Sequence, residues 1–153
     1  MNKGFTLIET ILYIALLSLL IGGALFVSFN LIDNSSAIRI KFITEEEVGF
    51  ILKKINWALT GVQTINSPSP GTTSSSLSIT RFGLPAFQNP LVFSASSGMV
   101  MMTRGSGTAV EISSDNVTVQ NLLFTRTTST PEAVRVDFSI NNVSSSMTKY
   151  LRK

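Results

Sequence analysis

The chain has 153 residues, which suffice for one small domain beside a membrane segment but not for two ordinary domains. It contains no cysteine and no histidine, which excludes disulfides and a thiolate nucleophile and removes the usual general base and the commonest metal ligand. The formal charge of +3 is spread along the chain without a basic block, so composition does not point to a nucleic-acid-binding arm.

The N-terminal part of the sequence contains an apolar run long enough to cross a bilayer. From Thr10 to Ile32 there are 23 residues without a charge, and about 20 suffice for a transmembrane helix. Glu9 stands directly before this run, where a carboxylate disfavours insertion into the membrane. The run fits a secretory signal peptide cut near Ala24, an uncleaved signal anchor, or the start of a membrane-anchored subunit that needs the glutamate.

The third interpretation comes from a family resemblance. The residues KGFTLIE, from Lys3 to Glu9, together with the apolar run resemble the leader and first residues of type IV pilins and type II secretion pseudopilins. The resemblance implies that a prepilin peptidase cuts between Gly4 and Phe5 and methylates the new amine of Phe5. It also implies that Glu9 pairs with the N-terminal amine of a neighbouring subunit, which would offset the cost of a carboxylate in a low-dielectric filament core.

Beyond the apolar run the sequence continues as an amphipathic helix, with no proline before Pro68. One apolar stripe follows the spacing of a single helix face and should pack on a sheet: Val48, Ile51, Leu52, Ile55, Leu59 and Val62. Ile43, Phe50 and Trp57 recur every seven residues and point to nearly the opposite side. Either a loop covers this second stripe, or Trp57 is a scattered exposed aromatic residue, or the stripe packs against neighbouring helices in a filament.

The second half of the sequence predicts an antiparallel sheet. Pro, Gly and Ser crowd the segment from Asn66 to Ser76, which predicts neither helix nor strand. Strand-like stretches follow at residues 77–82, 91–95, 99–103, 109–112, 116–124 and 133–140. The last alternates most regularly, with Val134, Val136, Phe138 and Ile140 on one face, and turns are expected at residues 105–107 and at Asn141-Asn142.

These observations predict an α+β, pilin-like fold. Its expected parts are a leader peptide (1–4), a long N-terminal helix (5–63) with a transmembrane part (5–32) and an amphipathic part (33–63), a linker (64–76) and an antiparallel β domain (77–153). The C-terminal half of the helix should pack on the β domain. In pattern, residues 116–140 resemble the C-terminal part of J-type minor pseudopilins and W-type minor pilins.

The sequence predicts no catalytic site, metal site or cofactor. The acidic residues of the second half, Glu111, Asp115, Glu132 and Asp137, are not grouped for acid–base catalysis or for metal binding. The leading interpretation is therefore a structural subunit, a minor pilin or pseudopilin that assembles into or primes a type IV pilus, a competence pilus or a type II secretion pseudopilus. The alternative is a single-pass anchored β-domain binding protein outside the cytoplasm that does not polymerise.

The leading interpretation sets the expected partners and location. The partners are a prepilin peptidase, other pilins or pseudopilins, the inner-membrane assembly platform and the membrane itself. Nucleic acid is expected only if the filament belongs to a DNA-uptake pilus. The chain is expected in the inner membrane as a single-pass protein with its C-terminal domain outside the cytoplasm, and then in an extracellular or periplasmic filament.

Overall fold

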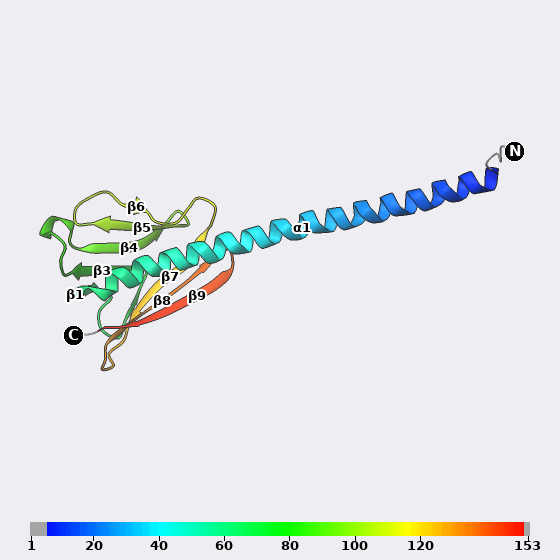
Figure 1. The fold of residues 1–153 in the computed structure, drawn as a ribbon. Coiled ribbons are helices and arrows are strands. Elements are labelled where there is room, and N and C mark those ends of the chain that lie inside the picture. Colours follow the sequence, from blue (N-terminus) through cyan, green and yellow to red (C-terminus); the bar gives the residue numbers. More distant parts are fainter. Residues whose placement is uncertain (1–5, 152–153) are drawn as a thin grey trace. The chain divides into compact units, whose positions relative to one another are not determined.

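The computed structural model describes residues 6–151, without the side chains of residues 33, 34, 36 and 37. A long helix, α1 (Leu7–Thr60), is followed by antiparallel strands (Figure 1), so the fold is α+β as the sequence predicts. The chain divides into two structural units, Met1–Lys41 and Phe42–Lys153.

The first unit holds the apolar part of α1. Its segment Leu7–Ile32 has 26 residues and is apolar and long enough to cross a membrane. At 1.5 Å per residue the segment measures about 39 Å, which exceeds the roughly 30 Å hydrocarbon core of a bilayer. Polar side chains within it bond to their own helix: Ser18 Oγ donates to the Ile14 carbonyl at 2.8 Å and Asn30 Nδ2 to the Phe26 carbonyl at 2.8 Å. These bonds leave fewer polar groups unsatisfied in lipid.

In the second unit, the C-terminal part of α1 packs on the strands. Ile51, Ile55 and Ala58 are fully buried, and Leu59 nearly so, among core residues from both sheets such as Leu77, Phe93, Phe124 and Val136. Val48 and Leu52 are half-buried against the same core, so the stripe expected to face a sheet does so within the helix. Full burial of a side chain the size of Ile51 or Ile55 contributes roughly 1.5–3 kcal/mol to stability.

The helix ends earlier than the sequence predicts. It stops at Thr60, and strand β1 (Val62–Ser67) begins two residues later. Val62 therefore belongs to a strand and not to the helical stripe. The segment 64–76 is also not a plain linker, because β1 extends into it and a short strand, β2 (Thr73–Ser74), lies near its end.

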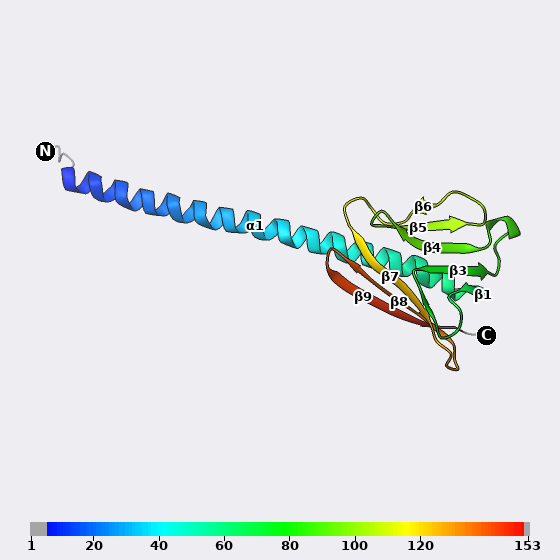
Figure 2. The same ribbon diagram turned by 180° about the vertical axis from the view of Figure 1, so that it is seen from behind.

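The strands form two antiparallel sheets where the sequence predicts one. Within the described residues, the five-stranded sheet has the order β1-β3-β4-β5-β6, with β3 (Ser76–Arg81), β4 (Leu91–Ser96), β5 (Met99–Arg104) and β6 (Val110–Glu111). A short 3-10 helix, η1 (Ala86–Gln88), connects β3 to β4. The four-stranded sheet has the order β2-β7-β8-β9, with β7 (Val119–Arg126), β8 (Ala133–Ile140) and β9 (Val143–Tyr150). In both Figures 1 and 2 the C-terminal end of α1 runs alongside the strands of both sheets.

Strand β8 confirms the alternation in its sequence. Val134, Val136, Phe138 and Ile140 are buried, whereas Arg135 is exposed and Asp137 and Ser139 are half-buried. Asn141 and Asn142, at φ 49° and 68°, form the two-residue turn to β9. Such left-handed residues are what the twist of a tight hairpin requires. The expected turn is therefore present, although β9 itself is absent from the strands that the sequence predicts.

Candidate assembly segment and exposed helix face

The N-terminal segment carries the first group of expected site residues. Gly4 and Phe5, the expected cleavage and methylation positions, lie outside the described residues. The Thr6 carbonyl accepts the backbone N–H groups of Glu9 at 3.1 Å and Thr10 at 3.2 Å, so the helix is established directly after the expected cut. Glu9 thus lies in the first turn of α1. A negative charge is favourable there because the N-terminal end of a helix carries partial positive charge.

Glu9 also has a side-chain partner on its own helix. The Tyr13 hydroxyl lies 3.3 Å from Glu9 Oε1 and donates a hydrogen bond to it. Glu9 is half-buried, whereas the other described residues up to Ile32 are exposed. Sequence reasoning missed Tyr13, although the i, i+4 spacing that brings the two side chains together is visible in the sequence. The N-terminal end of the helix and the Tyr13 hydroxyl therefore stabilise the charged carboxylate of Glu9 within a single chain.

The second group of site residues lies on the solvent side of α1 in the second unit. Phe50 is 45 % exposed and Trp57 is 39 % exposed, but Ile43 is half-buried against the core and does not share their exposure. Phe42, at 62 % exposure, replaces it at that end of the stripe. We call the resulting surface the outer face and define it by six residues at helical spacing: Phe42, Glu46, Gly49, Phe50, Lys53 and Trp57.

Cations cover the two aromatic rings at the C-terminal end of the outer face. Lys54 Nζ lies 5.3 Å from the centre of the Phe50 ring, and the Arg81 guanidinium lies 4.1 Å from the centre of the Trp57 ring. Both distances suit a cation–π interaction, which favours one orientation of each ring. Arg81 comes from β3 and is remote in sequence, so no local pattern could have predicted this partner of Trp57.

Two shallow hollows adjoin along the outer face and share Phe50 and Lys53 in their linings. The first, of about 540 Å³, surrounds Gly49, where an added Cβ would meet no atom within 4 Å. The second, of about 310 Å³, lies between the helix and β5 and is lined by Trp57, Met102 and Arg104 among others. The outer face is therefore uneven and carries both charge signs, which are features that a packing partner can match.

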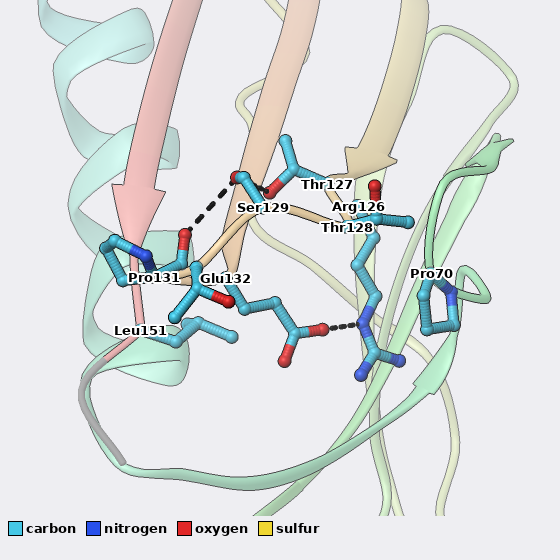
Figure 3. A pocket seen from close by; sticks show the side chains of 9 residues that line it. Pro70, Arg126, Thr127, Thr128, Ser129, Pro131, Glu132 and Leu151 are labelled. Atoms are coloured by element: carbon cyan, nitrogen blue, oxygen red, sulfur yellow. Dashed lines mark hydrogen bonds and ion pairs between the residues drawn. The ribbon is translucent and has the colours of Figure 1, made fainter.

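A further cleft, of about 440 Å³, lies at the end of β7 and β8 and is lined by Arg126, the 127–132 connection, Pro70 and Leu151. Figure 3 shows Arg126 paired with Glu132, and Ser129 bonded to Thr127 and to the Pro131 carbonyl. Arg126 Nη1 also donates to the carbonyls of Ile65 at 3.1 Å and Pro68 at 3.4 Å. Through these bonds the Arg126 guanidinium holds the end of β1 against the β7–β8 connection. Arg126 therefore has a structural role.

One comparison with known proteins identifies the N-terminal segment. Residues 1–25 match the family model described as the prokaryotic N-terminal methylation motif. No curated protein and no solved structure matches the chain. The match covers Gly4, Phe5, Glu9 and most of the apolar run, which confirms the resemblance noted for KGFTLIE. The N-terminal segment of this chain is therefore a prepilin-type methylation segment, of the kind that type IV pilins and type II secretion pseudopilins carry.

Proposed function

We propose that the chain is a minor pilin or pseudopilin that joins or primes a type IV pilus, a competence pilus or a type II secretion pseudopilus. The observation that carries the proposal is the match of residues 1–25 to the N-terminal methylation motif. The helix that begins at Leu7, its membrane-length apolar segment and the following α+β domain support it. The functional surface in this proposal is an interface between subunits and not an active site.

Processing supplies the group that Glu9 needs. A prepilin peptidase cuts the bond between Gly4 and Phe5 and methylates the new amine of Phe5. Glycine suits the position before the cut because it has no Cβ and lets the backbone enter a narrow active site. The carboxylate of Glu9 then pairs with the Phe5 amine of a neighbouring subunit. Because an unpaired charge in a low-dielectric filament core is costly, this pair favours subunits that dock in one register.

The proposal also sets a sequence of locations. Before assembly, the segment Leu7–Ile32 anchors the chain in the inner membrane as a single span. The C-terminal domain lies outside the cytoplasm. The assembly platform then moves the subunit into a filament with other pilins or pseudopilins. If that filament takes up DNA, nucleic acid becomes a further partner.

The role of Glu9 can be tested by assembly. The parent chain, Glu9→Ala and Thr10→Ala are expressed in cells with a prepilin peptidase and an assembly system, and sheared filaments are probed for the chain. Glu9→Ala should be processed normally but recovered at least about tenfold less, because it lacks one partner of a buried pair. Thr10→Ala serves as the control, since the Thr10 hydroxyl donates to the carbonyls of Thr6 and Leu7 at the start of the same helix. Equal recovery of Glu9→Ala and the parent would sink the proposed pairing.

A further inference from the structure

The side of the four-stranded sheet that faces away from the core carries a polar hollow of about 360 Å³. Strands β7, β8 and β9 all contribute to its lining. Leu123, Asp137 and Ser146 are cross-strand partners and lie in one row across these strands. Arg135 follows two residues before Asp137 on the same side of β8. The strand pairing therefore gathers an apolar side chain, two charged groups and a hydroxyl on one surface.

An irregularity in β7 adds a free amide to the polar hollow. The pairing of β7 with β8 shifts between Gln120 and Leu123, and Asn121 lies in this bulge with a left-handed backbone at φ 54°. Bulges change the direction of side chains and recur beside binding sites. Asn121 is exposed, and its side chain makes no hydrogen bond to another described residue. The amide of Asn121 is therefore available to a ligand both as a donor and as an acceptor.

The charges of the polar hollow cancel each other. Arg135 Nε lies 2.9 Å from both carboxylate oxygens of Asp137, and Arg135 Nη2 lies 2.8 Å from Asp137 Oδ1. Such a forked contact orients both groups and leaves further N–H donors and oxygen lone pairs unused. Among the described residues, no other charged side chain lines the hollow. Leu123, at 42 % exposure, adds an apolar surface beside the pair.

We propose that the polar hollow binds a neutral carbohydrate. A sugar ring presents hydroxyls that donate and accept hydrogen bonds, which suits the amide of Asn121, the Arg135–Asp137 pair and the serine hydroxyls of β9. Its C–H groups suit the apolar surface of Leu123. The cancelled charge argues against nucleic acid and other polyanions, because these bind surfaces with a net positive charge. This inference goes beyond the proposed function, since it gives the β domain a ligand whether or not the chain is assembled.

A glycan array tests the proposed ligand class. The full chain is purified in a detergent without sugar headgroups and applied to immobilised neutral oligosaccharides of glucose, galactose, mannose and N-acetylglucosamine. We expect binding to at least one of them, with displacement by the same oligosaccharide in solution. Acidic oligosaccharides and single-stranded DNA on the same array should give no stronger signal. The absence of binding to every neutral oligosaccharide, or stronger binding to the acidic probes, would overturn the inference.

Three variants test whether the polar hollow is the site. Asn121→Gly keeps the left-handed backbone and removes the amide, and Arg135→Ala removes an exposed guanidinium. Each should weaken binding to the same oligosaccharide at least about fivefold, the effect of one lost hydrogen bond of about 1 kcal/mol. Asn142→Gly is the matched control, because Asn142 also has a left-handed backbone at φ 68° but does not line the hollow.

The fluorescence of Trp57 during urea denaturation reports whether each variant is folded. Arg135→Ala keeps the test decisive if Asn121→Gly does not fold, since the Arg135 side chain is 57 % exposed. Loss of binding in both hollow variants, or in Arg135→Ala where Asn121→Gly is unfolded, with full binding by Asn142→Gly, supports the inference. Unchanged binding by folded hollow variants, or an equal loss in Asn142→Gly, places the ligand elsewhere and overturns it.

Discussion

At the scale of single residues, two arginines with acidic partners have different roles. Arg126 and Glu132 are each about 16 % exposed in their side chains, and Arg126 also bonds to carbonyls at the end of β1. Arg135 pairs with Asp137 at 2.8 Å, but its side chain is 57 % exposed. The hydrogen bond and charge of Asp137 raise the pKa of Arg135, yet solvent screens the pair. Burial therefore decides which arginine matters for stability.

The first prediction compares these two arginines. Arg126→Ala should lower the free energy of unfolding by about 1–3 kcal/mol, because a largely buried carboxylate loses its guanidinium and two carbonyls lose a donor. Arg135→Ala should change it little. Urea denaturation of the full chain in detergent, followed by the fluorescence of the single tryptophan, Trp57, measures both. A larger loss for Arg135→Ala than for Arg126→Ala would contradict the structural role of Arg126.

At the scale of elements, hydrogen bonds from the β8–β9 turn join the four-stranded sheet to the helix α1. Asn141 Oδ1 accepts the Thr118 N–H at 3.2 Å, and Asn141 Nδ2 donates to Thr44 Oγ1 at 3.2 Å. Thr44 comes from α1 and is buried. Asn142 has a left-handed backbone, and no side-chain bond is described for it. The two asparagines of one turn therefore differ, since Asn141 makes tertiary bonds and Asn142 mainly serves the turn geometry.

The second prediction follows from this difference. Asn142→Gly should keep or raise the free energy of unfolding by up to about 1 kcal/mol, because glycine adopts the left-handed conformation without strain. Asn141→Gly should lower it by about 1–2 kcal/mol, because it removes two side-chain hydrogen bonds. The same denaturation assay compares the variants. If both substitutions have equal effects, the bonds from Asn141 to Thr118 and Thr44 contribute nothing to stability.

The sequence predicts the elements that carry a strong apolar period. Two predictions are confirmed: the helical stripe through Ile51 and Ile55, and the alternation in β8. In both elements the apolar face is buried in the core. Strand β9 is missed because it pairs on one side only and its sequence, VSSSMTKY, contains few residues that a core requires. β1 is missed because Val62 continues the helical spacing although the helix ends at Thr60. Residue propensities and the spacing of apolar residues do not fix the ends of helices and strands where strand pairing in the folded domain decides them.

Among the candidate site residues, those with partners nearby in the sequence could be predicted, whereas those with partners from distant elements could not. Glu9 stands out in the sequence because a charge beside an apolar run needs an explanation. Its partner Tyr13 stands four residues further along the same helix, a spacing that the sequence itself shows. The seven-residue spacing from Phe50 predicts that Ile43 lies on the exposed stripe. This prediction is wrong, because the direction of Ile43 falls between the two faces and its side chain packs against the core. Arg81 over Trp57 depends on how β3 packs beside the helix, which no local pattern contains.

At the scale of the whole molecule, the chain combines a prepilin-type N-terminal segment with an α+β domain that exposes part of the same helix. The prepilin-type segment contains Glu9 and most of an apolar stretch long enough to cross a membrane, while the second unit carries the outer face with Glu46, Phe50 and Lys53. The proposed role of Glu9 depends on one chemical event, the cut between Gly4 and Phe5, because only that cut creates the amine that Glu9 is proposed to meet.

The most direct test is therefore the mass of the N-terminus. The full chain and Gly4→Val, which adds a branched side chain before the cut, are coexpressed with a prepilin peptidase, purified and analysed by mass spectrometry. The account predicts a chain that begins at a methylated Phe5, and an uncut Gly4→Val variant. A parent chain that retains Met1, or one that is cut near Ala24, would contradict it and remove the explanation of Glu9.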